Sequence, residues 1–372
     1  MKGSPVKGFS IACFASFVAM APSFALGRVS VLTGVNVVGV QTMSEQQQDA
    51  LIEQLVKNGV KTVRTGLGVK FNRFIIHAFQ HGIGAVVILY PTEASSGTMR
   101  AADPSVGLQW AVMPLSKADP VKFGDWFASQ LAPLEAAGVR LTAFELGNEI
   151  NGPFFNGDFL PEQASGRVLG LADLTNPNDV EGQTIAASYR SYLRIASVLK
   201  EQRDHSKINQ STPILSAGLA DGGLPGKKPG QRLDGVSIPA TLQFMRQIGL
   251  DKFVDGYAVH VYPSNNAETP LSARAEVLAK DTFAMCTEVK PCWVTEWNFN
   301  TPNKACPLND EKRKQLVEAE RRAFQPFAEQ GKLAAALWYM WSSDFYGEKE
   351  NQGAIFRCGA LTEAGKLALS PI

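Results

Sequence analysis

Two glutamates stand at the ends of apolar, strand-like runs, where a charged side chain needs a chemical reason. Glu149 ends the segment 144–149 (FELGNE), and Glu296 lies in the segment 293–297 (WVTEW). A carboxylate is unfavourable inside a buried strand unless it is paired. Glycosidic bond hydrolysis uses such a pair, because one carboxyl group protonates the leaving oxygen while the other attacks the sugar or activates water. The two segments therefore suggest this chemistry.

The rest of the chain alternates between strand-like runs, rich in Val, Ile and aromatic residues, and amphipathic helical runs. The strand-like runs cover 29–38, 62–65, 85–90, 141–146, 214–217, 256–261, 292–296 and 334–341. Helical runs include 45–58, 121–137, 184–202, 239–249, 272–286 and 310–331. This alternation predicts an α/β fold, a (β/α)8 TIM barrel around a parallel sheet. An open, doubly wound sheet is the alternative, but eight units and the lack of a Gly-rich dinucleotide turn favour closure.

The predicted connections differ in length at the two ends of the barrel. Long βα loops rich in Gly, Pro and Asn cover 91–120, 151–182, 219–237 and 299–309, whereas the αβ links are short. In a barrel the βα loops gather at the C-terminal face, where barrel enzymes place their sites. Glu149 would follow strand four and Glu296 would end strand seven, so the long loops would surround both with a substrate cleft.

This arrangement resembles the clan A glycoside hydrolases, which carry an Asn-Glu acid/base at strand four and a Glu nucleophile at strand seven. The resemblance implies a retaining reaction with Glu149 as acid/base, Glu296 as nucleophile and Asn148 on the sugar 2-hydroxyl. Families 5 and 39 are the most similar, although Ile150 replaces the Pro that commonly follows the Asn-Glu pair. We expect a bare barrel without the extra β-sandwich of many family 39 enzymes.

Other residues match supporting positions of the clan's site. His260 and Tyr262 share one face of predicted strand six, where the clan has a His that lines the sugar subsite and a Tyr that hydrogen-bonds the nucleophile. Arg64 resembles the strand-two Arg that keeps the nucleophile ionised, and Asn36 would contribute to the floor of the site. A structural His and a surface Arg are the alternatives. Glu145, deeper on the face of Glu149, needs a partner and is expected to be structural.

Aromatic side chains are the expected platforms for the apolar faces of sugars. Trp341 resembles the Trp that clan members place beneath the sugar at the end of strand eight, and Trp297 is a second candidate. Trp126 and Trp293 are expected in the core. The loop aromatics that could form further subsites are Trp110, Phe154, Phe155, Phe345 and Tyr346.

The first residues are typical of an export signal. An apolar stretch over 9–20 follows two lysines, and the triplet at 23–25 (SFA) has the small-x-small form of a signal-peptidase site. We expect residues 1–25 to be cleaved, which leaves 26–372 as one catalytic barrel that is secreted or periplasmic. A membrane anchor is the alternative, but the stretch is shorter than the roughly 20 residues of a span and is followed by Pro22.

The cysteines fit an exported protein. Cys13 would leave with the signal, and the even number that remains favours disulfides over zinc ligands. Cys286 and Cys292 would lie at the N-terminal face of the barrel, whereas Cys306 and Cys358 would lie in βα loops at the opposite face. Because bonded cysteines need Cα atoms within roughly 7 Å, the first two should pair with each other, and so should the last two.

The bulk composition excludes several other classes of protein. The chain is 45% hydrophobic and 19% charged with a net charge of +1, so we expect neither disorder nor a nucleic-acid partner. A serine-hydrolase elbow is absent and the histidines do not cluster like metal ligands, so no metal or cofactor is expected. We expect a monomer without a membrane span in the mature form.

The expected activity is retaining hydrolysis of a β-linked oligo- or polysaccharide by the two glutamates. Two alternatives keep the same residues. A transglycosylase would resolve the covalent intermediate with a second sugar, and an inactive barrel would only bind carbohydrate, because a fold alone does not prove activity.

Overall fold

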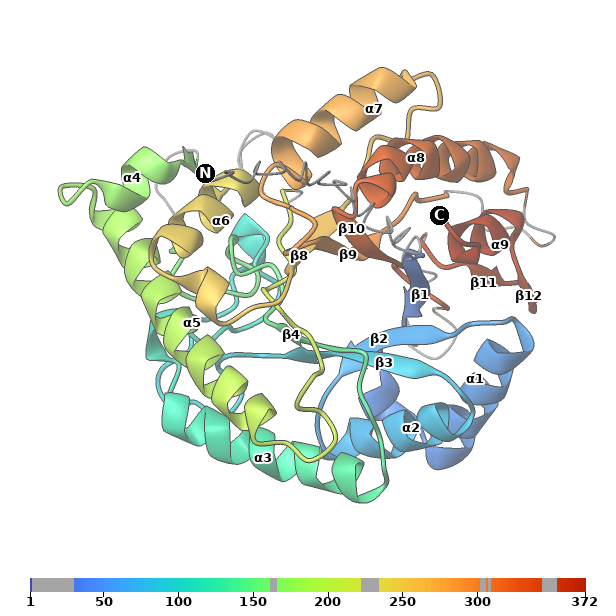
Figure 1. Ribbon diagram of the computed structural model, residues 1–372, viewed down its shortest axis with the longest axis horizontal. Helices are drawn as coiled ribbons and strands as arrows, with labels where there is room; N and C mark the ends of the chain where they lie inside the picture. Colours follow the sequence, from blue (N-terminus) through green and yellow to red (C-terminus); the bar gives the residue numbers. More distant parts are fainter. Residues whose placement is uncertain (2–29, 161–165, 222–233, 302–305, 307–308, 343–352) are drawn as a thin grey trace.

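The computed structural model describes residues 1, 30–160, 166–221, 234–301, 306, 309–342 and 353–372. Eight parallel strands in these ranges form a nearly closed barrel surrounded by helices (Figure 1). They are β1 (Leu32–Asn36), β2 (Thr62–Gly66), β3 (Gly84–Leu89), β4 (Ala143–Leu146), β6 (Ile214–Leu215), β8 (Tyr257–Val261), β9 (Cys292–Trp297) and β10 (Leu333–Trp338). The predicted (β/α)8 barrel is confirmed.

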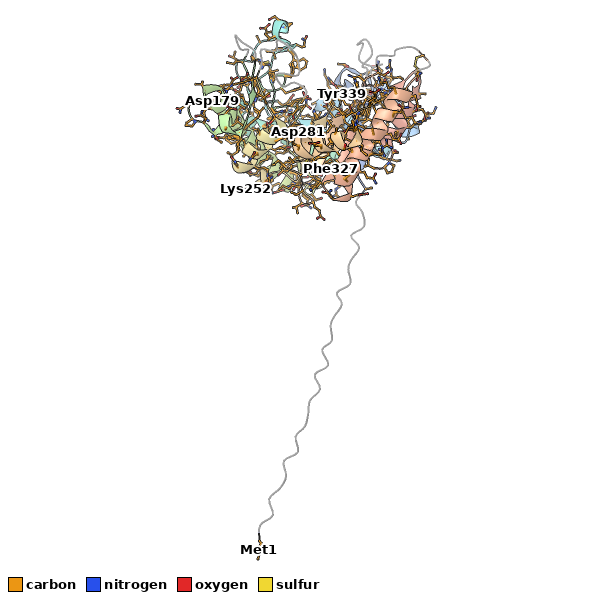
Figure 2. The ribbon with its side chains drawn as sticks, turned by 90° about the horizontal axis from the view of Figure 1, so that it is seen from above. Met1, Asp179, Lys252, Asp281, Phe327 and Tyr339 are labelled. Atoms are coloured by element: carbon orange, nitrogen blue, oxygen red, sulfur yellow. A yellow bond between two sulfur atoms is a disulfide. The ribbon has the colours of Figure 1, made fainter. Side chains whose placement is uncertain are left out.

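The strands are hydrogen-bonded in the order β6-β4-β3-β2-β1-β10-β9-β8. The two outer members of this order are joined by isolated parallel bridges, Leu215 with Gly256 and Leu219 with Val259. These bridges bring β6 against β8 and almost complete the ring. The βα loops therefore surround one end of the barrel. Figure 2 shows Tyr339, just after β10, at this end, and Lys252, just before β8, at the opposite end.

Helices cover the outside of the barrel with their apolar faces. They are α1 (Glu45–Lys57), α2 (Val69–Gln80), α3 (Pro120–Ala136), α4 (Leu171–Thr175), α5 (Val180–Asp204), α6 (Ile238–Gln247), α7 (Leu271–Val277), α8 (Glu311–Glu329) and α9 (Glu363–Leu369). Two short strand pairs lie outside the barrel sheet, β5 (Val168–Leu169) with β7 (Gly235–Val236) and β11 (Phe356–Arg357) with β12 (Ala360–Leu361). Helix α1 begins where Ser44 and Gln47 form a reciprocal capping box.

The barrel interior has an apolar layer below a polar one. The apolar layer is a small cluster of inward-facing side chains, Val86, Ala143, Leu215, Ala258 and Leu337. Side chains on a strand face the same way every two residues. The next inward positions towards the C-terminal ends of β4 and β8 are therefore Glu145 and His260, both buried. The two-residue strand period therefore places these polar side chains directly above the apolar layer, towards the C-terminal ends of the strands.

A β-bulge in β9 changes this period at one place. On β8, Val259 is opposite Val294, but the next residue, His260, is opposite Glu296. The pairing of β9 with β10 shifts in the same region. The extra residue lets Thr295 and Glu296 both face the interior, where Thr295 Oγ1 donates to Glu145 and Glu296 contacts Arg64. Such bulges re-aim side chains next to active sites.

Both predicted disulfides are confirmed. Cys286 pairs with Cys292 at a Cα distance of 5.4 Å, and Cys306 pairs with Cys358 at 5.8 Å. No helix within the described ranges is both long enough and apolar enough to cross a membrane. Apart from Met1, the expected signal segment, 1–25, lies outside the described residues, as do Phe345 and Tyr346.

Candidate active site

Arg64, on β2, lies at the centre of the polar layer with 1% of its surface exposed. Its guanidinium group holds Glu145 through two hydrogen bonds of 2.6 and 2.9 Å. It also donates to Glu296 Oε1 at 2.5 Å, and to the side-chain oxygens of Asn36 and Asn148 at 2.8 Å each. These contacts use all five of its N–H groups. The buried cation is therefore fully paired, which a buried charge requires.

Two neighbouring carboxylates keep the buried Arg64 guanidinium ionised. Burial works against the charged form of Arg64, but Glu145 and Glu296 outweigh it and raise the pKa of the guanidinium. Glu145 receives a further hydrogen bond of 3.0 Å from Thr295. Its two oxygens thus face donors on β2 and β9, as expected for a structural carboxylate.

Glu296 is buried but surrounded by groups that favour its ionised form. Burial alone would raise its pKa, but His260, Arg64 and the hydroxyl of Tyr262 together lower the pKa below the ordinary value of 4.5. The Tyr262 hydroxyl donates to Oε2, and Arg64 donates to Oε1. Both oxygens are therefore held in place, and the carboxylate stays charged in mildly acidic solution.

Glu149 is presented by a sharp turn directly after β4. Its backbone φ of 43° is left-handed, which is uncommon outside glycine. The turn is held by a 2.6 Å hydrogen bond from its N–H to the carbonyl of Gly218. Its side chain is 24% exposed, against 8% for the Glu296 side chain. Glu149 is thus the more accessible of the two carboxyl groups.

His260 lies between the two glutamates. Its Nδ1 is 2.8 Å from Glu149 Oε1 and 3.6 Å from Glu296 Oε2. Burial acts to lower the pKa of the imidazole, but the two carboxylates prevail and raise it above 6.5. A side chain at position 218 would not fit here, because a Cβ on Gly218 would lie 2.3 Å from His260 Nε2.

The two carboxyl groups approach each other closely around this imidazole. One ligand atom each from Glu149, His260 and Glu296 can be chosen so that all lie within 4.8 Å of one another. Three such groups could also ligate a cation. The Arg64 guanidinium already binds Glu296, however, and would repel a metal ion at that carboxylate. The donor set therefore suits a pair of reacting carboxyl groups better than a metal.

Two solved structures with the same fold are described as glycosidases. A GH39 β-xylosidase from Caulobacter crescentus has 16% sequence identity and a TM-score of 0.55, over 92% of this chain and 70% of its own. An endo-1,4-β-mannanase from Rhizomucor miehei has 12% identity and a TM-score of 0.51, over 91% of this chain and 93% of its own. A comparison with curated proteins finds no match. Residues 230–368 match the family model described as the glycosyl hydrolase catalytic core. Part of the chain is thus similar to a glycosyl hydrolase catalytic core, and the whole barrel has the fold of these glycosidases.

The two tryptophans expected to stack on the sugar do not line the candidate site. Strand β10 ends at Trp338, three residues earlier than predicted, so Trp341 lies outside the sheet. Trp341 is 1% exposed, stacks on Phe356 and donates to Gln54 of α1 at 2.7 Å. Trp297 is fully buried and packs edge-on against Trp338. Neither indole has a free face, so the predicted platform role is wrong for both.

The other predicted residues of the site lie in one cluster. Asn148, Arg64, His260 and Tyr262 all contact a glutamate or the Arg64 network. Asn36 is also present, but it is buried, and its amide nitrogen donates to the carbonyls of Thr295 and Trp338. It therefore orients Arg64 and does not reach a substrate.

Tyr90 is a residue of this site that the sequence reasoning missed. It directly follows β3 and is 38% exposed. Burial of its ring raises the pKa of the phenol to about 12, with Arg64, Glu296 and Glu145 among the charges that act on it. A signal existed in the sequence, because Tyr90 ends an apolar strand just before a long βα loop.

Proposed function

We propose that this chain is a secreted, retaining glycoside hydrolase that cleaves β-linked oligo- or polysaccharides with Glu149 and Glu296. The observation that carries the proposal is the close approach of two carboxyl groups in unlike surroundings. Retaining enzymes hold their carboxyl groups about 5 Å apart, whereas inverting enzymes leave room for a water molecule. Glu296 accepts hydrogen bonds from Arg64 and Tyr262, whereas Glu149 accepts from neither of them.

In the first step Glu296 acts as the nucleophile. Its carboxylate oxygen bonds to the anomeric carbon as the bond from that carbon to the leaving oxygen breaks. Glu149 gives its proton to the leaving oxygen. The clamp by Arg64 and Tyr262 keeps Glu296 charged and aimed without reorganisation during the reaction.

In the second step a water molecule attacks the same carbon and releases Glu296. Glu149, now a carboxylate, takes a proton from this water, and the product keeps the starting anomeric configuration. His260 donates its Nδ1 proton to Glu149 Oε1 at 2.8 Å, which leaves the other oxygen of Glu149 for the transferred proton. The raised pKa of His260 favours the protonated imidazole, in which Nδ1 is a donor.

Asn148 is proposed to bind the sugar 2-hydroxyl. Its Oδ1 accepts from Arg64, so the orientation of the amide is fixed, because a guanidinium group can only donate. The Asn148 nitrogen has no hydrogen bond to any residue in the described ranges. It is therefore available to a sugar hydroxyl beside Glu149.

Export is part of the proposal. Two disulfides are typical of proteins in an oxidising compartment, and residues 1–25 read as a signal peptide. We propose a secreted or periplasmic monomer whose mature chain, 26–372, is one catalytic barrel.

The test compares two variants on aryl glycosides. Glu296→Ala should be nearly inactive on every substrate. Glu149→Ala should keep turnover of substrates with an activated leaving group and should gain rate from added azide, which replaces the base-assisted water. Equal losses in both variants without azide rescue would contradict this division of roles. No turnover of any glycoside by the parent enzyme would favour the inactive, carbohydrate-binding barrel.

A further inference from the structure

Two long loops form a single unit beside the catalytic glutamates. The loop after β3 contains a hairpin closed by antiparallel bridges, Arg100 with Val112 and Asp103 with Leu108. Trp110 lies in this hairpin. The loop after β4 contains Phe154 and Phe155. Both loops begin at strands that also lead into the site, since β3 precedes Tyr90 and β4 precedes Glu149.

Hydrogen bonds hold the two loops together. Arg100 donates to the carbonyls of Pro153 at 2.6 Å and Phe159 at 2.8 Å. The indole nitrogen of Trp110 donates to the carbonyl of Phe154 at 2.9 Å. The backbones also meet directly, because a Cβ on Gly157 would lie 2.5 Å from the carbonyl oxygen of Val112. These contacts fix the direction of the aromatic rings that the loops carry.

The rings form a continuous row that begins at Tyr90, directly after β3. Tyr90 stacks on Phe155 with ring centres 6.4 Å apart and an interplanar angle of 17°. Phe155 meets Trp110 at 5.8 Å. Trp110 is 47% exposed although its nitrogen is satisfied within the protein. An indole that is fixed by a hydrogen bond and half exposed to solvent is suited to stack against the apolar face of a sugar.

We propose that Tyr90, Phe155 and Trp110 are a sugar-binding row that selects oligosaccharides longer than a disaccharide. The inference rests on the proposed function, because the row continues from the site of cleavage. A sugar chain whose scissile bond lies between Glu149 and Glu296 can extend over these rings. Stacking on the C–H faces of its outer units then adds binding energy. A monosaccharide glycoside bound at the glutamates would not extend as far as Trp110, so Trp110 would add nothing to its binding energy.

The proposal is tested by binding, with cleavage prevented by Glu296→Gln. This variant is titrated with β-1,4-linked xylose, mannose and glucose oligomers of increasing length, followed by calorimetry and tryptophan emission. For the sugar that binds, affinity should rise with chain length and the emission should shift to the blue. Adding Trp110→Ala should weaken binding of the longest oligomer about tenfold, equivalent to about 1.4 kcal/mol, and the loss should grow with chain length. Trp110→Phe should restore part of it.

Phe79→Ala is the matched control, because Phe79 is a partly exposed aromatic residue on α2, outside both loops. It should bind every oligomer like the parent. The proposal is overturned if affinity does not depend on chain length, if no oligomer binds, or if Trp110→Ala and Phe79→Ala behave alike. Phe155→Ala gives a second test should Trp110→Ala fold poorly. If oligomer binding depends on chain length but the wild-type protein cleaves no glycoside, the proposed function is contradicted and the sugar-binding row is still supported.

Discussion

Tyr262→Phe removes one hydroxyl from the nucleophile and leaves its other partners in place. The hydroxyl donates to Glu296 Oε2. A hydrogen bond to a charged group contributes about 1.5–3 kcal/mol, and Tyr262 is 41% exposed, which places it at the low end. A loss of about 1.5 kcal/mol corresponds to about one pKa unit. The pKa of Glu296 should therefore rise by about one unit.

The consequence is measurable in the pH dependence of kcat/KM. The nucleophile must be ionised, so the acid limb of the profile follows its pKa and should move up by about one pH unit. The pH dependence of the folding stability should shift in the same direction. Because the folded pKa of Glu296 is depressed, its ionised form stabilises the fold above the unfolded pKa, and this contribution is lost as pH falls through the folded pKa. In the variant this contribution should be smaller, and its loss should be complete at a higher pH.

Tyr257→Phe is the control from the same strand. The Tyr257 hydroxyl also donates to a carboxylate, Asp251 Oδ1, but at the N-terminal end of the barrel. Its removal should leave the acid limb unchanged. An acid limb that stays in place in Tyr262→Phe, or that moves equally in both variants, would refute the claim that Tyr262 holds the nucleophile ionised.

Three further predictions concern metal ions, one disulfide and export. EDTA should leave activity intact, and a loss restored by a divalent ion would mean that Glu149, His260 and Glu296 ligate a metal. Replacing Cys306 and Cys358 with Ser should lower the free energy of unfolding by about 3–4 kcal/mol, because their bond closes a 52-residue separation; unchanged denaturant midpoints would contradict this. The exported protein should begin near residue 26 by N-terminal sequencing, and a retained leader would contradict cleavage.

The sequence predicted the barrel and the glutamate pair because both follow from simple periods. Strand and helix patterns alternate clearly, and residues at the ends of parallel strands must meet at one face. The disulfide pairs followed for the same reason, since cysteines at opposite faces cannot reach each other.

The sequence failed where the backbone departs from its regular period. Strand eight was extended to Trp341, but the sheet ends at Trp338 and the following residues leave it. The bulge that turns both Thr295 and Glu296 inward could not be read from alternation, because one inserted residue leaves no mark in the composition. Tyr90 directly follows β3, so its place at the end of an apolar strand was the signal that could have found it.

The anomeric form of the first product tests the central claim most directly. The wild-type enzyme is mixed with a β-linked aryl glycoside or oligosaccharide that it cleaves, and proton NMR follows the anomeric signals before mutarotation. Attack by Glu296 on one face of the anomeric carbon, followed by attack of water on the opposite face, inverts the carbon twice and predicts that the β-anomer appears first. Initial appearance of the α-anomer would show inversion and would contradict the two-step mechanism, even if both glutamates proved essential.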